Sequence, residues 1–380
     1  MKILHVSDTH LGFSAYRKAT PDGINQREMD IYRAFEQFID YAIDKKPDLI
    51  IHAGDLFDSV RPNNRAITFA VNQIFRLAKK EIPVVIISGN HEHPKLKETG
   101  HIFSIFDNIE HTYPIYNCKY ETLFFEIDNK KIAVHAIPQC NTKKEYNYEL
   151  KKLKPDKTSD YNILVSHGSV TGVQDFTMNE FNELIIPAKI LSRNFDYIAL
   201  GHFHRYTQLA DNAFYSGSTE SLTFTDANDK KGFLELNVSD KKIKPKFIEI
   251  ETRPMVDVKP IKCSNLKLEE IMKNIKERVT EAKPKEKTMR ITLDDIPLAV
   301  YRSLDLNEIR KLTHDAVHYE IKANIAKKEA GDKQASSSKI DALVNEFVKF
   351  LEAQKIEDLG TLKELGIGYI EKIQTREEGK

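Results

Sequence analysis

The stretch VVIISGNHEH, Val84–His93, largely decides how the rest of the sequence is interpreted. Its first half is a short apolar run rich in β-branched residues, which is typical of a strand buried on both faces. Its second half supplies an amide, a carboxylate and two imidazoles directly beyond that strand. Side chains of these types bind metals or move protons, so we expect a functional site at the carboxyl end of this strand.

Similar apolar runs recur along the first 210 residues and alternate with helical patterns. The expected strands are Ile3–Ser7, Leu49–Ala53, Val84–Ser88, Ile163–Ser166 and Tyr197–Leu200. Apolar residues at helical spacing separate the first three of these runs, around 31–42 and 67–78. This alternation predicts βαβ units and a layered α/β fold. The runs LFFEI and IAVHAI, joined by the turn-like DNKK, predict a hairpin in a second sheet.

Composition and cysteine usage bound the class of protein. A chain of 380 residues predicts two or three compact units, and a formal net charge of +0 excludes a global basic field that would attract nucleic acid. The three cysteines form no CxxC pair, which predicts neither a disulfide framework nor a thiolate zinc site and favours the cytoplasm. We expect no signal peptide and no membrane span.

Changes in pattern predict four segments. Residues 1–247 form the larger domain, which AFYSGSTE and GFLELNV close as edge strands. Residues 248–326 predict a small α+β domain, whose strands include KFIEIE and MVDVKPI. The charged, Ser-rich stretch 327–339 predicts a linker. Residues 340–374 predict two amphipathic helices, which either fold back on the protein or dock on a partner.

A local excess of basic residues lies at the start of the small domain. Between positions 240 and 290 the chain carries 15 Lys or Arg residues against 9 Asp or Glu residues. Such an excess is consistent with a solvated face. It is also what a surface that contacts a phosphate backbone requires.

Polar donors follow five of the expected strands. They are Asp8, His10, Asp55, Asn90, His167, His202 and His204. Ligands of a doubly wound sheet bind at the carboxyl ends of its strands. Carboxylate, amide and imidazole donors without thiolate suit Mn²⁺, Fe²⁺ or Zn²⁺. The donors exceed what one ion with an open coordination position needs, so they predict two ions that share a carboxylate, roughly 3.5–4 Å apart.

The same residues carry a family resemblance. The series Asp8-x-His10, Gly54-Asp55, Gly89-Asn90-His91-Glu92, His167 and Gly201-His202-x-His204 resembles the signature of the calcineurin-like metallophosphoesterases. The stretches DTHLG, GDLFDSVRPNNRA and YSGSTESLTFTD are most similar to DNA double-strand-break repair nucleases of the meiotic-recombination and SbcD type. The resemblance implies a layered sandwich of two sheets flanked by helices, a small α+β capping domain and a C-terminal helical tail.

The resemblance also implies roles for individual residues. One ion would be held by Asp8, His10, Asp55 and His204, and the other by Asp55, Asn90, His167 and His202. The ions would be two Mn²⁺, although other divalent ions are possible. His91 resembles the family's catalytic histidine, which assists the departing oxygen. Asp58 stands where some of these nucleases have a histidine, so no role is carried over to it.

The implied function is a Mn²⁺-dependent DNA phosphodiesterase in double-strand break repair. Its expected activities are 3′-to-5′ exonuclease and single-strand endonuclease, and its expected substrates are DNA ends and single strands. The protein is expected to be a homodimer. The expected partner is a coiled-coil ABC-type ATPase, bound through the C-terminal helices. Two alternatives remain, a phosphomonoesterase or protein phosphatase with the same donors, and a non-catalytic repair scaffold.

Overall fold

A computed structural model describes residues 1–171, 183–239 and 242–326, together with positions 347–348, 351, 360 and 362–369. The expected linker 327–339 lies outside the described residues, as does most of the expected helical segment 340–374. The described positions of that segment are helical. Within the described part of the chain, no helix is long and apolar enough to cross a membrane.

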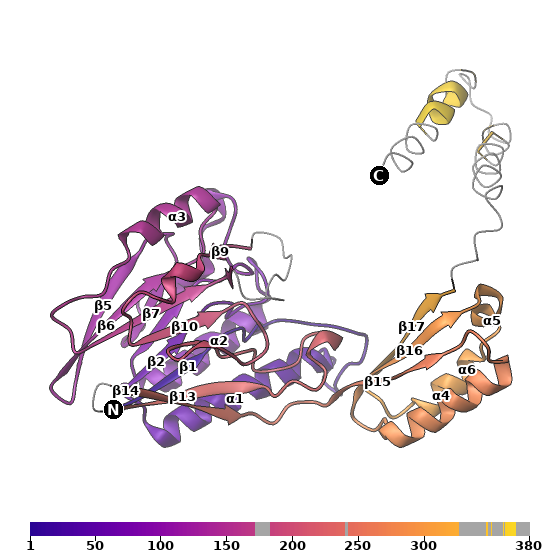
Figure 1. The fold of residues 1–380 in the computed structure, drawn as a ribbon, viewed down its shortest axis with the longest axis horizontal. Helices are drawn as coiled ribbons and strands as arrows, with labels where there is room; N and C mark the ends of the chain where they lie inside the picture. The colour runs from indigo at the N-terminus through magenta and orange to yellow at the C-terminus, as the bar shows by residue number, and fades with distance from the viewer. Residues whose placement is uncertain are drawn as a thin grey trace.

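Two six-stranded sheets form the larger unit (Figure 1). The first sheet has the spatial order β14 (Lys242–Glu249), β13 (Gly232–Ser239), β1 (Lys2–Val6), β2 (Leu49–His52), β3 (Val84–Ile87) and β4 (Thr112–Ile115). The second has the order β11 (Thr207–Ala210), β12 (Ala213–Tyr215), β10 (Tyr197–Gly201), β7 (Tyr161–His167), β6 (Lys130–Ile137) and β5 (Glu121–Ile127). Strands β1 to β4 run parallel, and so do β6, β7 and β10.

Helices cover the outer faces of both sheets. They are α1 (Gln26–Lys45) and α2 (Asn64–Ala78) on the first sheet and α3 (Lys143–Lys152) on the second. The two-residue period of β1 shows the layering, because Leu4 and Val6 pack in the core under α1 and α2, whereas Ile3 lies in the core between the sheets. The result is a sandwich of two sheets flanked by helices, which confirms the predicted fold class.

Short elements complete this unit. They are β8 (Ser169–Val170) and β9 (Ile185–Ile186), which pair with each other, and the 3₁₀ helices η1 (Lys97–Thr99), η2 (Ile102–Phe106), η3 (Ala188–Ile190) and η4 (Phe224–Asp226).

The strand predictions need two corrections. Strands β12 and β13 are not edge strands, because β11 and β14 pair with their outer sides. The stretch KFIEIE, expected in the small domain, lies mostly in β14 and pairs with β13 as far as Glu249. Hydrophobic periodicity identified these strands but did not specify their neighbours, which depend on contacts between distant segments.

The smaller unit is a three-stranded parallel sheet with helices. Its elements are β15 (Met255–Lys262), α4 (Leu268–Ala282), β16 (Thr288–Ile296), α5 (Leu298–Arg302), α6 (Leu306–Leu312) and β17 (His318–Ile325). Ile271, Ile275 and Val279 recur at four-residue spacing on α4 and are buried in the core of this unit. Figure 1 shows this unit beyond the ends of α1 and β14. The chain enters it through the short segment between β14 and β15.

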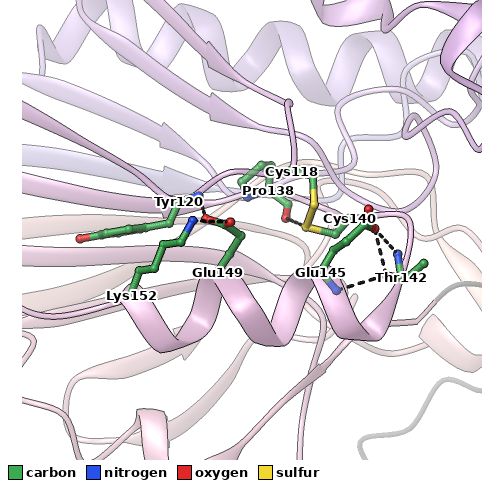
Figure 2. Close-up of a disulfide and its surroundings, with 8 residues drawn as sticks. All are labelled: Cys118, Tyr120, Pro138, Cys140, Thr142, Glu145, Glu149 and Lys152. Carbon is green, nitrogen blue, oxygen red and sulfur yellow. Dashed lines mark hydrogen bonds and ion pairs between the residues drawn. A yellow bond between two sulfur atoms is a disulfide. The ribbon is translucent and has the colours of Figure 1, made fainter.

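A disulfide joins Cys118 to Cys140, with the two Cα atoms 4.7 Å apart (Figure 2). The sequence analysis expected no disulfide framework, and it did not anticipate this single bond. The two cysteines lie 22 residues apart and form no motif. They meet because the connections after β4 and β6 lie side by side in the folded chain. The pairing removes cysteine usage as support for a reducing compartment.

Candidate metal centre

The predicted donors converge at one edge of the sandwich. Asp8 and His10 follow β1, Asp55 follows β2, and Asn90 follows β3. From the second sheet, His167 ends β7, while His202 and His204 follow β10. The sheets are joined here directly, since the His202 backbone N–H donates to Asp8 Oδ1 at 2.8 Å and His167 Nε2 lies 3.2 Å from Asp55 Oδ2. All seven predicted donors therefore lie in one cluster.

Several of these donors adopt an uncommon backbone conformation. Asp8 (φ 52°), His10 (φ 45°), Asp55 (φ 54°) and His202 (φ 101°) all have positive φ. Non-glycine residues rarely adopt such angles, which cost of order 1–3 kcal/mol each and concentrate at functional sites. The chain turns sharply after each strand, and this turn directs a polar side chain into the cluster.

The donors form two groups around Asp55. In one, ligand atoms of Asp8, His10 and His204 all lie within 4.8 Å of one another. In the other, the same holds for Asp55, His167 and His202. Asn90 belongs with the second group, because its Oδ1 lies 2.9 Å from His167 Nε2 and 3.0 Å from His202 Nδ1. Asp55 Oδ2 also lies 3.9 Å from His10 Nε2, so this carboxylate lies between the groups.

The cluster fits divalent cations. Asp55 Oδ2 is buried between two imidazoles, 3.2 Å from His167 Nε2 and 3.9 Å from His10 Nε2. The Nε2 atoms of His10 and His204 face each other at 3.2 Å. Buried acceptors that face one another are unfavourable unless a cation or proton lies between them. Oxygen and imidazole donors are the set that borderline divalent ions prefer.

The ionisation of the metal-free cluster points the same way. Burial acts against charge on both partners, yet His167 holds the pKa of Asp55 well below its usual range. In return Asp55 outweighs burial and raises the pKa of His167 to about 9. A proton shared by this pair thus supplies the positive charge that a metal ion would bring.

Gly89 shows why the loop after β3 has its sequence. A Cβ atom at this position would lie 2.1 Å from Asp55 Oδ1. Any side chain there would displace the carboxylate that lies between the two groups. The glycine in SGNHEH is therefore set by close approach to Asp55.

His91 and Glu92 occupy different environments in this loop. The His91 backbone N–H donates to Asp55 Oδ1 at 3.0 Å, and its Nδ1 lies 3.1 Å from the carbonyl oxygen of Asp58. The ring of His91 is 28% exposed, and one of its ligand atoms lies within 4.8 Å of those of His10 and Asp55. Glu92 is fully buried and accepts the Gly89 N–H at 2.7 Å, so it shapes the turn.

Two further histidines have a structural role. His5 and His52 are buried within strands. His5 Nδ1 lies 3.0 Å from the Tyr197 hydroxyl, and His52 Nε2 lies 3.0 Å from the Thr9 hydroxyl. Burial lowers the pKa of both rings to about 3, so each is neutral.

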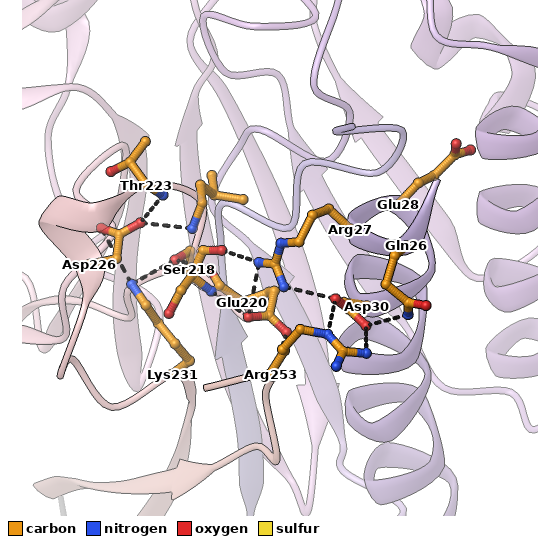
Figure 3. A network of polar contacts seen from close by, with 12 residues as sticks. Gln26, Arg27, Glu28, Asp30, Ser218, Glu220, Thr223, Asp226, Lys231 and Arg253 are labelled. Atoms are coloured by element: carbon orange, nitrogen blue, oxygen red, sulfur yellow. Dashed lines mark hydrogen bonds and ion pairs between the residues drawn. The ribbon is translucent and has the colours of Figure 1, made fainter. Parts of the chain in front are cut away.

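The sequence reasoning missed residues that support the donors. Lys231 is buried and donates to the carbonyl oxygen of His204 at 2.8 Å, and it pairs with Asp226 at 3.6 Å. Figure 3 shows it in a polar network that continues through Ser218 and Glu220 to Arg27. The buried residues of YSGSTE were a possible signal, because a polar stretch that follows a buried strand must find internal partners.

The comparison with protein families decides the classification. The model of the family described as calcineurin-like phosphoesterase matches residues 1–206, more than half of the chain. The chain belongs to this family. The fold and the donor set of the family imply divalent metal ions, in agreement with the cluster described above.

Two curated relatives are similar to most of the length of this chain. The chain is 29% identical to a protein of Methanococcus maripaludis over 328 residues, which cover 82% of each chain. It is 27% identical to a protein of Sulfolobus acidocaldarius over 343 residues, 85% of this chain and 82% of the relative. Both relatives are named DNA double-strand break repair protein Mre11. The resemblance found from the motifs is thereby confirmed.

Solved structures match more distantly. A protein of Thermus thermophilus, TT1561, aligns with a TM-score of 0.40 at 12% identity, over 65% of this chain and 98% of that one.

Proposed function

We propose that this phosphoesterase is a Mn²⁺-dependent DNA phosphodiesterase of double-strand break repair. The observation that carries the proposal is the position of Asp55 between two groups of metal donors, with His91 beside them. A pair of ions that share a carboxylate suits the in-line displacement at a phosphate ester. The names of the relatives support DNA as the substrate.

The geometry supports the division of donors that the family resemblance implies. One ion would be held by Asp8, His10, Asp55 and His204, the other by Asp55, Asn90, His167 and His202. Two Mn²⁺ ions, when bound, would supply the Lewis-acid charge that activates water and neutralises the developing charge on the phosphate. Backbone N–H groups already hold the carboxylates of Asp8 and Asp55, so these two donors need little reorganisation on binding.

His91 is the proposed general acid. Its backbone N–H is anchored on Asp55, while its Nδ1–H donates to the Asp58 carbonyl oxygen. The Asp58 carboxylate lies 3.8 Å from the same Nδ1. The Nε2–H is then the proton that His91 delivers to the departing alcohol oxygen.

The remaining parts of the proposal concern substrate and partners. The activities are 3′-to-5′ exonuclease and single-strand endonuclease, and the smaller unit, 248–326, contributes a basic surface to DNA binding. Residues 340–374 dock on a coiled-coil ABC-type ATPase through amphipathic helices. The protein acts as a homodimer in the cytoplasm.

Digestion of end-labelled duplex and single-stranded DNA tests the proposal. We expect cleavage of both with Mn²⁺ and none with EDTA, and only slow hydrolysis of a small phosphomonoester. If the monoester is hydrolysed rapidly and the DNA is not cleaved, the protein is instead a phosphomonoesterase or protein phosphatase. An inert protein that still binds the ATPase would identify a scaffold. Removal of residues 340–374 should abolish ATPase capture and leave cleavage unchanged.

A further inference from the structure

Two of the donor histidines, His10 and His167, place their second ring nitrogen next to an oxygen. His10 Nδ1 lies 3.2 Å from Asp58 Oδ1, and His167 Nδ1 lies 2.8 Å from the Ala53 carbonyl oxygen. In each case the other nitrogen, Nε2, faces the cluster. Such an oxygen fixes both the orientation of the ring and the nitrogen that remains available to a metal.

His202 is arranged the opposite way. Its Nδ1 faces the cluster, 3.0 Å from Asn90 Oδ1, and its Nε2 lies 3.4 Å from Glu183 Oε1. His204, two residues later, presents Nε2 to the cluster instead. A histidine that uses Nδ1 needs a partner at Nε2, because otherwise the ring could rotate or exchange tautomers. Glu183 is the carboxylate in that position.

Local structure brings Glu183 to this place. Strand β8 follows His167 and pairs with β9, and the Ser169 N–H donates to the Leu184 carbonyl oxygen at 3.0 Å. The Ser169 hydroxyl also donates to Glu183 Oε1. Gly168 permits the approach, because a Cβ atom there would lie 2.5 Å from the Leu184 carbonyl oxygen. The Glu183 side chain is only 12% exposed, so its carboxylate is held rather than solvated.

We propose that Glu183, held by Ser169, is a positioning residue that orients His202 so that its Nδ1 faces the second ion. The inference rests on the proposed two-ion centre and assigns a role to a residue outside the family motifs quoted above. Glu183 contacts no reacting atom in this scheme. It acts only through His202.

The test compares Glu183→Ala, Glu183→Gln and wild type as full-length, metal-free protein. Titration calorimetry with Mn²⁺ should show two ions bound by wild type. In Glu183→Ala the affinity for one ion should fall roughly 10- to 100-fold, while the other ion is retained. Glu183→Gln keeps an oxygen acceptor and should restore most of the lost affinity. Glu126→Gln, an exposed change on β5, should match wild type.

A second readout is the tautomer of His202, observed by NMR of ¹⁵N-histidine-labelled, metal-free protein. Wild type should carry a ring proton on Nε2, which faces Glu183, and Glu183→Ala should lose this preference. Unchanged Mn²⁺ affinity and an unchanged tautomer in Glu183→Ala would overturn the inference. Neither readout uses DNA, so failure of the inference is distinguishable from failure of the proposed nuclease activity. Thermal unfolding of each metal-free variant verifies that it is folded.

Discussion

The larger and smaller units both contain parallel strands covered by helices, yet they bury very different side chains. The larger unit buries carboxylates and imidazoles at the carboxyl ends of its strands. Among the described residues of the smaller unit, the buried polar side chains are those of Thr288, Thr292 and Thr313. Burying an acid or imidazole is costly unless a partner offsets the lost hydration. The parallel sheet edge is therefore only a scaffold, and the chemistry depends on which donors follow the strands.

The largest expected effect comes from Asp55, the carboxylate that both ions of the larger unit are proposed to share. We expect Asp55→Ala to lose both ions and to reduce DNA cleavage by on the order of 10⁴-fold or more, because the ion pair supplies several kcal/mol of transition-state stabilisation. Metal analysis and cleavage rates measure both effects. The matched change Asp257→Ala, in the smaller sheet where the carboxylate pairs with Arg290, should leave the metal content at the wild-type value. Two ions retained by Asp55→Ala would refute the shared carboxylate.

The next largest effect separates catalysis from ligation. His91→Gln should keep both ions and lose cleavage by about 10²- to 10⁴-fold, the usual contribution of a general acid. His314→Gln, at an exposed histidine of the smaller unit, is the control and should cleave like wild type. Because His91 also lies within reach of His10 and Asp55, loss of one ion from His91→Gln would identify it as a ligand instead.

The junction of the two units offers a stability test. Arg253 pairs with Asp30 at 2.6 Å and with Glu286 at 2.8 Å, and the pair with Asp30 is nearly buried (Figure 3). Arg253→Ala should lower the free energy of unfolding by about 3 kcal/mol, because it leaves a buried carboxylate with one partner fewer. Chemical denaturation measures the change, with Arg302→Ala as an exposed control. Metal content should not change, and a change would show that the junction controls the centre.

The smallest expected effect is a pH dependence of metal binding. Since Asp55 raises the pKa of His167 to about 9, a proton must leave before an ion binds. The Mn²⁺ affinity should therefore rise by about tenfold per pH unit between pH 7 and 9. In the metal-free protein the same group stabilises the fold below its unfolded pKa, and this contribution disappears as the pH rises through about 9. A flat titration over this range would contradict the assignment.

Much of the fold and the centre was predictable from local patterns. Strand β3 is encoded by Val84–Ile87, and its turn requires Gly89 next to Asp55. The donors were predictable because each follows a strand that has its own apolar signature. The order of the strands within each sheet was harder to predict, as β12 and β13 show. An apolar run indicates a strand but does not indicate which strand pairs with it.

The residues that hold the donor side chains in place were not predictable from the sequence. Glu183 and Lys231 stand far from the donor motifs in sequence, and neither has a periodic signature. The bond between Cys118 and Cys140 joins two connections whose proximity exists only in the folded chain. Contacts of this kind depend on the relative placement of distant segments.

The sequence alone determined the family and the set of donor side chains, because strand-end motifs are short and each is complete within a few residues. The tertiary structure decided which nitrogen each ring presents to the cluster. His202 and His204 lie two residues apart and yet use opposite nitrogens, since their partners come from different elements. Ring orientation follows from packing between elements, which the local sequence does not encode.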